Sequence, residues 1–175
     1  MDSLKQYLLN HPQDLKEWLA KFPWENFESE MVVQANTIEK FVIAKHVTLE
    51  IDAEVSGLLI CQEAEIQEGA EIQGTMLCET GRLDRNAECN YLIGCTVTIG
   101  EDAEIRSAMI SDSLELKGGA EVDELETLDS TKIEIHEQNL IKKSLKLPAD
   151  DFVAAVDQRL RIILETAISL LKSGD

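Results

Sequence analysis

Single aliphatic positions recur along the middle of this chain at intervals of 16 or 17 residues. They accompany a short phrase, Ala-Glu preceded by Asp, Gly or Asn, that occurs five times. Its alanines step by 17, 17, 16 and 17 residues and are Ala53, Ala70, Ala87, Ala103 and Ala120. A period of this size, carried by single positions and not by blocks of helix, is typical of a β-solenoid. Each copy is then one rung of a coil, and stacking the rungs buries a continuous core.

Aligning the copies on the alanine predicts which residues point into the coil. Positions an even number apart on a strand share a face. The inward columns four residues before and two residues after the alanine contain Leu49, Ile66, Leu83, Ile99 and Leu116, and then Val55, Ile72, Cys89, Ile105 and Val122. The columns six and eight residues after it begin with Leu59, Met76, Ile93 and Met109, and with Cys61, Cys78 and Cys95. Each rung is expected to hold three short strands. Partial rungs at 41–44 and 132–135 extend the stack to roughly 6 to 7 rungs, about 30 Å tall.

Helical patterns flank the repeats. Leu15, Trp18, Leu19 and Phe22 follow helical spacing near the start of the chain, and a wide apolar stripe predicts a helix over 149–172. We therefore expect a mainly β protein in three parts: an N-terminal helical cap (1–29), a single-stranded β-helix (30–147) and a C-terminal amphipathic helix (148–175). The aromatic residues of the first part are suited to lie over the first rung, and the last helix is expected to pack on the solenoid or on a partner.

The third strand of each rung is apolar on both faces, although a solvated strand should alternate. Something must therefore cover its outward side chains. The C-terminal helix is one cover, a second copy of the chain is another, and an apolar ligand groove is a third. The alanine alignment assigns to this candidate interaction surface the residues Leu58, Ile60, Leu77, Leu92, Ile110 and Leu125.

The formal net charge is −18, and residues 47–131 contain 20 acidic and 4 basic side chains. Such a surface repels phosphate backbones and anionic membranes, so nucleic-acid binding is not expected. The charge favours solubility, or a basic protein or divalent cations as partners. No apolar run of about 18 residues predicts a transmembrane segment. The chain starts without a basic and apolar leader, and with its cysteine pattern this predicts a reducing, cytoplasmic location.

Two columns could carry chemistry. An outward acidic ladder is predicted to be either a solvated charged face or a binding surface for cations or a basic partner. Repulsion between its carboxylates should raise some of their pKa values. It consists of Glu54, Glu71, Glu88, Glu104 and Glu121. The cysteine ladder of Cys61, Cys78 and Cys95 is predicted to be core packing, because a straight ladder without histidine does not make a tetrahedral metal site. We expect no cofactor and no catalytic residues.

The rungs resemble those of bactofilins, bacterial cytoskeletal proteins with a β-helical core. The resemblance covers about residues 30–146 and rests on phrases such as 53–61 (AEVSGLLIC) and 70–78 (AEIQGTMLC). It implies a right-handed, three-sided β-helix without cofactor or catalysis that polymerises end to end. The chain departs from the pattern in its apolar outward third strand, its flanking helices and its corner glycine, which only Gly57 and Gly74 retain.

Three hypotheses for function follow. The first is a non-catalytic, bactofilin-like scaffold that self-associates through its β-helix into an oligomer or polymer. The second is a capped binding module that forms a small homo-oligomer through the apolar third-strand face. The third is a diverged hexapeptide-type acyltransferase, for which only His11, His46 and His136 are available. A basic cluster near the end of the coil, Lys142, Lys143 and Lys146, suggests charge-guided contact between molecules.

Overall fold

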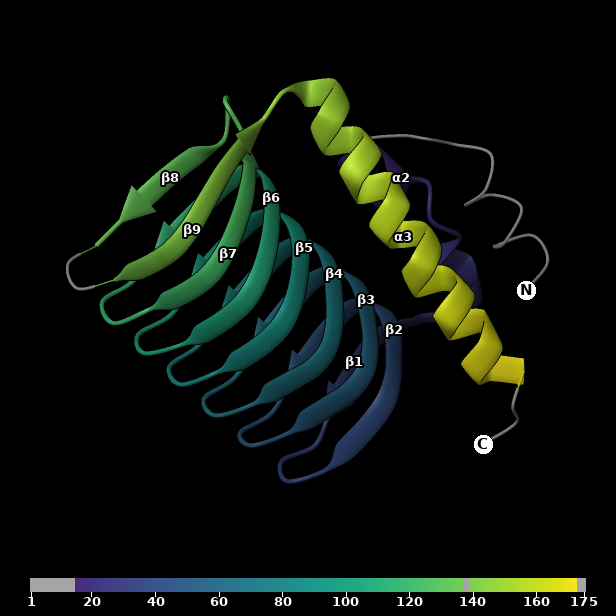
Figure 1. Ribbon diagram of the computed structural model, residues 1–175. Helices are drawn as coiled ribbons and strands as arrows, with labels where there is room; N and C mark the ends of the chain where they lie inside the picture. The colour runs from purple at the N-terminus through teal and green to yellow at the C-terminus, as the bar shows by residue number, and fades with distance from the viewer. Residues whose placement is uncertain (1–14, 137–138, 173–175) are drawn as a thin grey trace.

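The computed structural model describes residues 15–136 and 139–172. These described residues form one short α-helix and one turn of 3-10 helix, followed by nine strands and a long C-terminal helix (Figure 1). In chain order these are α2 (Leu15–Ala20), η1 (Trp24–Asn26), β1 (Glu28–Val33), β2 (Ile38–Leu49), β3 (Glu54–Ile66), β4 (Glu71–Leu83), β5 (Glu88–Ile99), β6 (Glu104–Leu116), β7 (Glu121–Leu128), β8 (Lys132–Ile135), β9 (Leu140–Leu147) and α3 (Ala149–Lys172).

The strands form a β-solenoid of about seven turns, as the repeat predicts. Each long strand pairs in parallel with the next one along the chain, and the five glutamates that follow the repeated alanines pair with one another in register. The last turn is divided. The first half of β6 pairs with β7 and its second half pairs with β8, while β7 pairs with β9.

The repeated phrase forms the sharp corner of each rung. The residue before each alanine has a positive φ, between 54° and 78° across Asp52, Gly69, Asn86, Asp102 and Gly119. Asn, Asp and Gly tolerate this left-handed conformation best. The alanine then points into the core, where all five copies are at most 1% exposed. The phrase is thus a turn signal joined to a small core residue.

Two further corners in each rung vary in length, and this variation changes which residues of the third strand point into the coil. In β3 the core residue Leu59 follows Val55 by four positions, whereas in β5 the core residue Leu92 follows Cys89 by three. In β6 the extra residue appears instead at the next corner, before Leu114. The longer corners of β3 and β4 need Gly57 and Gly74. A Cβ atom on Gly57 would collide with the carbonyl oxygen of Lys40, and one on Gly74 with that of Gly57.

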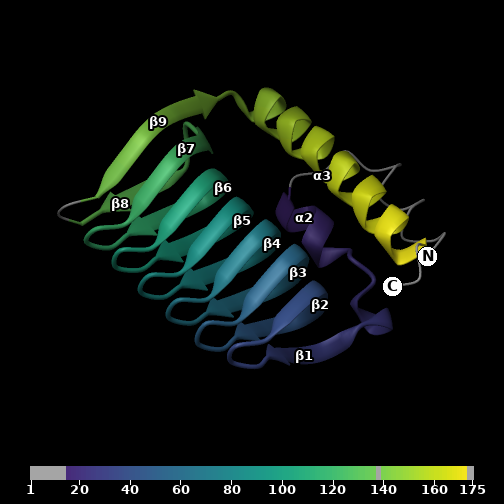
Figure 2. The same ribbon diagram turned by 60° about the horizontal axis from the view of Figure 1, so that its bottom comes forward.

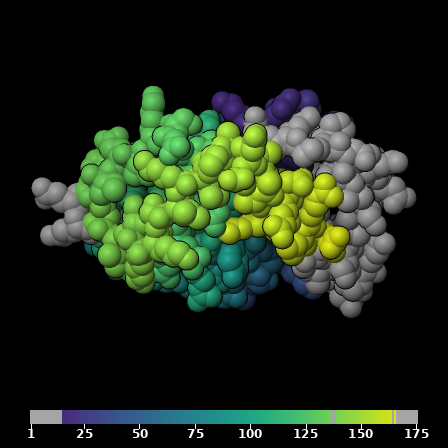
Figure 3. Space-filling view, turned by 45° about the horizontal axis from the view of Figure 1, so that its top comes forward, coloured from purple at the N-terminus to yellow at the C-terminus, as the bar shows by residue number. Residues whose placement is uncertain are grey.

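Both helices lie against the outside of one wall of the coil (Figures 1 and 2). Helix α2 contacts β4 and β5, and α3 contacts β7. The expectation that the N-terminal segment lies over the first rung is wrong for its described part. Trp18, Phe22 and Trp24 pack beside outward apolar residues of the wall, which buries their rings. Figure 3 shows α3 continuing the surface of the last strands.

Candidate interaction surfaces

The apolar third strand is covered by the chain itself. We call it the covered wall; it comprises 41–44, 58–61, 75–78, 91–94, 107–110 and 124–127. Its outward residues Leu58, Ile60 and Leu77 are at most 4% exposed. They pack in one cluster with Trp18 and Leu19 of α2, and α3 adds Phe152, Val156 and Leu160 to the same cluster. Three of the six residues predicted for the interaction surface therefore lie in an internal interface between coil and helices.

Half of the residues assigned to that surface point the other way. Leu92, Ile110 and Leu125 belong to the core inside the coil, and Ile93 and Met109 are the residues that pack under the helices. The alanine alignment is wrong at these positions. From β5 onward the corner before the covered wall is one residue shorter, and a shift of one residue exchanges the two faces of a strand.

The cysteine ladder is broken for the same reason. Cys61 and Cys78 pair in register inside the coil, but Gly94 stands opposite Cys78, and Cys95 packs under the helices. Burial raises the pKa of Cys61 and Cys78, that of Cys89 to about 12 and that of Cys95 to about 11. The thiols are therefore protonated near neutral pH and act as small apolar side chains.

The acidic ladder is present in the predicted register: Glu54, Glu71, Glu88, Glu104 and Glu121 pair in sequence. The pKa of Glu88 is raised by partial burial and then by the charges of Glu71 and Glu104. Repulsion thus contributes as predicted, but desolvation is the larger cause. In the part of the chain that the structure describes, no group of His, Cys, Asp and Glu has the arrangement of a metal site.

Removing the charge at the middle of this ladder should stabilise the fold at neutral pH. We expect Glu88→Gln to raise the free energy of unfolding at pH 7 by a few tenths of a kcal/mol, because like charges on adjacent strands destabilise by roughly that amount. Since the folded-state pKa of Glu88 lies above 4.5, protonation stabilises the wild type as pH falls from that pKa toward 4.5. The advantage of the variant should therefore shrink between pH 7 and pH 5 in thermal melts.

The matched control is Glu65→Gln, because Glu65 is exposed on another wall and lies between Thr48 and Arg82. This control should show no such gain. An advantage of Glu88→Gln that increases toward pH 5 would contradict the repulsion.

The acidic ladder is bounded by an apolar residue at each end. Its column continues to Ile38 in β2 at one end of the coil and to Leu140 in β9 at the other, so both terminal positions are apolar. Beside the last glutamate, Lys142 lies 2.6 Å from Asp123 and 4.0 Å from Glu121. The hydrogen bond to Asp123 raises the pKa of Lys142.

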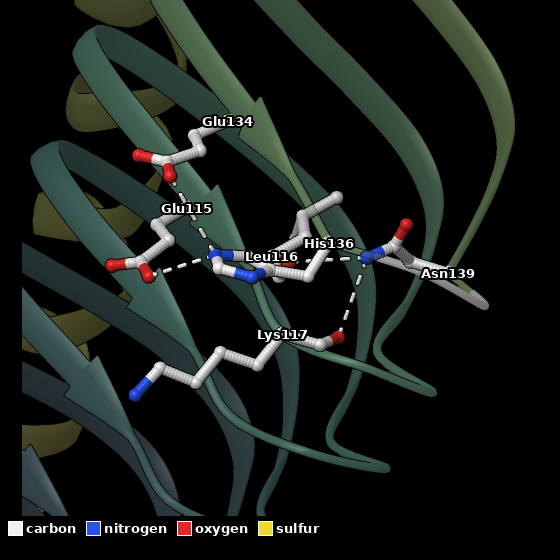
Figure 4. A network of polar contacts seen from close by, with 6 residues as sticks. All are labelled: Glu115, Leu116, Lys117, Glu134, His136 and Asn139. Carbon is white, nitrogen blue, oxygen red and sulfur yellow. Dashed lines mark hydrogen bonds and ion pairs between the residues drawn. The ribbon is translucent and has the colours of Figure 1, made fainter.

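His11 lies outside the described residues, and the other two histidines lie far apart along the stack. His46 is in β2 and its Nδ1 lies 3.2 Å from Oε2 of Glu63. His136 follows β8, where its Nε2 lies 3.1 Å from Glu115 and 3.7 Å from Glu134 (Figure 4). The same view shows Asn139, whose amide donates to the carbonyl oxygens of Leu116 and Lys117 at 3.0 and 3.4 Å. These contacts close the last corner of the coil.

A cavity of about 390 Å³ opens between α3 and the covered wall. Ile93 and Ile163 contribute apolar surface, and Tyr91, Arg106 and Arg159 add polar atoms. The guanidinium of Arg159 donates to Glu126 at 2.9 Å, so one of the two cations is already neutralised. The cavity therefore combines apolar walls with a polar rim whose charges are partly neutralised.

The two ends of the coil are its most exposed apolar regions. Of the eight large apolar side chains that are exposed among the described residues, five belong to β1, β2, β8 or β9. They are Val32, Ile38, Ile135, Leu140 and Leu145. The outer edges of these strands have no strand partner in the described part of the chain. Open edges of this kind are templates for pairing with another chain.

No protein-family model, curated protein or solved structure matches the chain. Among the described residues, no helix combines the length and the apolar character needed to cross a membrane.

Proposed function

We propose that this chain is a non-catalytic structural protein that self-associates through the ends of its β-solenoid, the role that its resemblance to bactofilins implies. The observation that carries the proposal is the pair of strand edges at the two ends of the stack, which have exposed apolar side chains and no strand partner among the described residues. The covered wall is a weaker candidate for self-association, because α2 and α3 would have to leave it first. Four buried, unpaired cysteines support a cytoplasmic setting.

The proposal is tested by placing a charge on an end rung. Ile38 is 66% exposed, and a contact between ends would bury it. We expect wild-type protein to form larger species as its concentration rises. Ile38→Lys should shift that transition to roughly tenfold higher concentration, the effect of losing about 1.4 kcal/mol per contact. Sedimentation velocity and negative-stain electron microscopy provide the measurement.

The matched control is Ile162→Lys in α3, because Ile162 is 58% exposed and lies away from the two ends. This variant should assemble like wild type. A wild-type protein that remains monomeric at every concentration would contradict the proposed function. Equal effects of the two lysine substitutions would show that assembly does not use the ends of the coil.

A further inference from the structure

The two ends of the coil are complementary steps. At the N-terminal end, β1 pairs only with the second half of β2, from Ala44 to Leu49, and leaves the edge at 38–43 without a strand partner among the described residues. At the C-terminal end, β9 extends the first half of the rung beyond β7, while β8 ends the second half. One end thus has an added half-rung where the other end lacks one.

The register of the strand pairs determines which residues would lie opposite each other if a second copy continued the coil. Following the paired columns from rung to rung brings β9 onto 38–43 of the next copy and brings β8 onto its β1. Four of the resulting pairs join two apolar residues, and the contact would remove the exposed side chains of Ile38, Leu140, Leu145 and Ile135 from water. The four pairs are Leu140 with Ile38, Leu145 with Ile43, Ile133 with Met31, and Ile135 with Val33.

This register contains two pairs of opposite charge, and it also places Glu39 in the column of Ile141. The column that starts at Glu30 runs through His46, Glu63, Thr80, Thr96 and Ser113 to Lys132, so a glutamate would meet a lysine across the junction. Glu28 and Lys146 share another column and would meet where β1 begins and β9 ends. Lys142 would approach Lys40, but Asp123 already neutralises Lys142 at 2.6 Å.

Contacts between like ends lack this complementarity. β8 and β9 carry four lysines and one glutamate, whereas β1 and residues 38–43 carry three glutamates and one lysine. Two C-terminal ends would bring together two basic edges, and two N-terminal ends would bring together two acidic ones. Like-charge juxtaposition at an interface suppresses such pairings.

We infer that the partner of each end is the opposite end of a second copy, so that the chain stacks head to tail in continuous register and forms a polar filament. This inference rests on the proposed function and adds to it the polarity and the register of the contact. A head-to-tail contact along the coil axis is heterologous and does not close on itself, so growth continues from both ends.

Single surface cysteines distinguish the possible contacts. The four native cysteines are at most 2% exposed, so a short bismaleimide should react only with introduced ones. Head-to-tail stacking brings position 38 of one copy beside position 140 of another. We expect mixtures of Ile38→Cys and Leu140→Cys to give covalent heterodimers, each variant alone to give none, and the double variant to give a ladder of multimers. Ile162→Cys is the control and should give no dimer.

Assembly is followed on the same samples by light scattering before cross-linking. Dimers of Ile38→Cys alone or of Leu140→Cys alone, or assembly without cross-linked heterodimers, would overturn the head-to-tail register and leave end-to-end assembly standing. Absence of assembly in every sample would overturn the proposed function as well.

A charge exchange tests the same register independently. Lys132→Glu should raise the concentration needed for assembly at least about threefold, because a favourable contact with Glu30 becomes a repulsive one. The double variant Glu30→Lys with Lys132→Glu should restore assembly to the wild-type concentration. Failure of the double variant to restore assembly, with both proteins folded by circular dichroism, would overturn the pairing.

Discussion

Replacing Ile66 by alanine should lower the free energy of unfolding by about 2–5 kcal/mol. Ile66 is fully buried and stands in the core column between Leu49 and Leu83, so its side chain contacts the rungs on both sides. Truncation removes buried apolar surface and leaves a cavity that the stacked backbone, held by parallel ladders, cannot close. The loss is a large fraction of the roughly 5–15 kcal/mol that stabilises a typical domain.

The measurement is equilibrium unfolding in denaturant, followed by far-UV circular dichroism. Glu65→Ala is the matched control, because Glu65 is the adjacent residue of β3 but is exposed. Its free energy of unfolding should change by no more than about 0.5 kcal/mol. Similar losses in the two variants would contradict the inward column.

Replacing Trp18 by alanine should release the N-terminal helix from the covered wall. Trp18 is 2% exposed, and its ring lies 5.3 Å from that of Phe22 between the centroids. Truncation of a buried tryptophan to alanine lowers the free energy of unfolding by about 3–5 kcal/mol. Helix α2 has six residues and cannot persist without its packing. We therefore expect a lower melting temperature and exposure of Leu58, Ile60 and Leu77.

The apolar surface that Trp18→Ala exposes can be detected by two measurements. Binding of a hydrophobic fluorescent dye should increase in Trp18→Ala, and lateral association through the covered wall should appear beside end-to-end assembly. Lys16→Ala removes an exposed neighbour and its 3.8 Å ion pair with Asp112, and should change neither readout. Unchanged stability and dye binding in Trp18→Ala would show that α2 does not protect the wall.

These two variants separate the parts of the molecule that the proposed function depends on. The Ile66 column supports the coil as a whole, whereas Trp18 shields one wall. The helices shield that wall. Among the described residues, the strand edges without a strand partner then lie at the two ends of the stack. Directing association to the ends is what a linear scaffold requires, because lateral contacts would produce irregular aggregates.

Much of the coil was predictable because its strongest signals are local. The residue before each alanine adopts a left-handed turn, and the alanine and the aliphatic positions around it have no alternative to the core. The C-terminal helix spans Ala149–Lys172 as its apolar stripe predicts. The acidic ladder was also predictable from the sequence, because in-register parallel pairing follows from the repeat itself.

The covered wall was not predictable in the same way. A rung of unchanged length can carry its extra residue at either of two corners, and the sequence period is identical in both cases. In β6, Met109 could therefore be assigned inward and Ile110 outward without conflict with the alanine spacing. In β5, the 16-residue step from Ala87 to Ala103 shows that one residue is missing but not which corner lacks it, so Ile93 could be assigned inward and Leu92 outward. Gly57 and Gly74 mark the long corner in β3 and β4, and their absence from the later rungs was the available signal.

By itself the amino-acid sequence determined the repeating coil, its length, its sharp corners and its acidic column, because each depends on residues close together in the chain. The tertiary structure alone decided which face of the covered wall turns outward, where the N-terminal aromatic residues dock and which residues meet in the columns that run from Glu30 to Lys132 and from Ile38 to Leu140. These features depend on register added over many rungs, and a single residue moved from one corner to another changes them without altering the period.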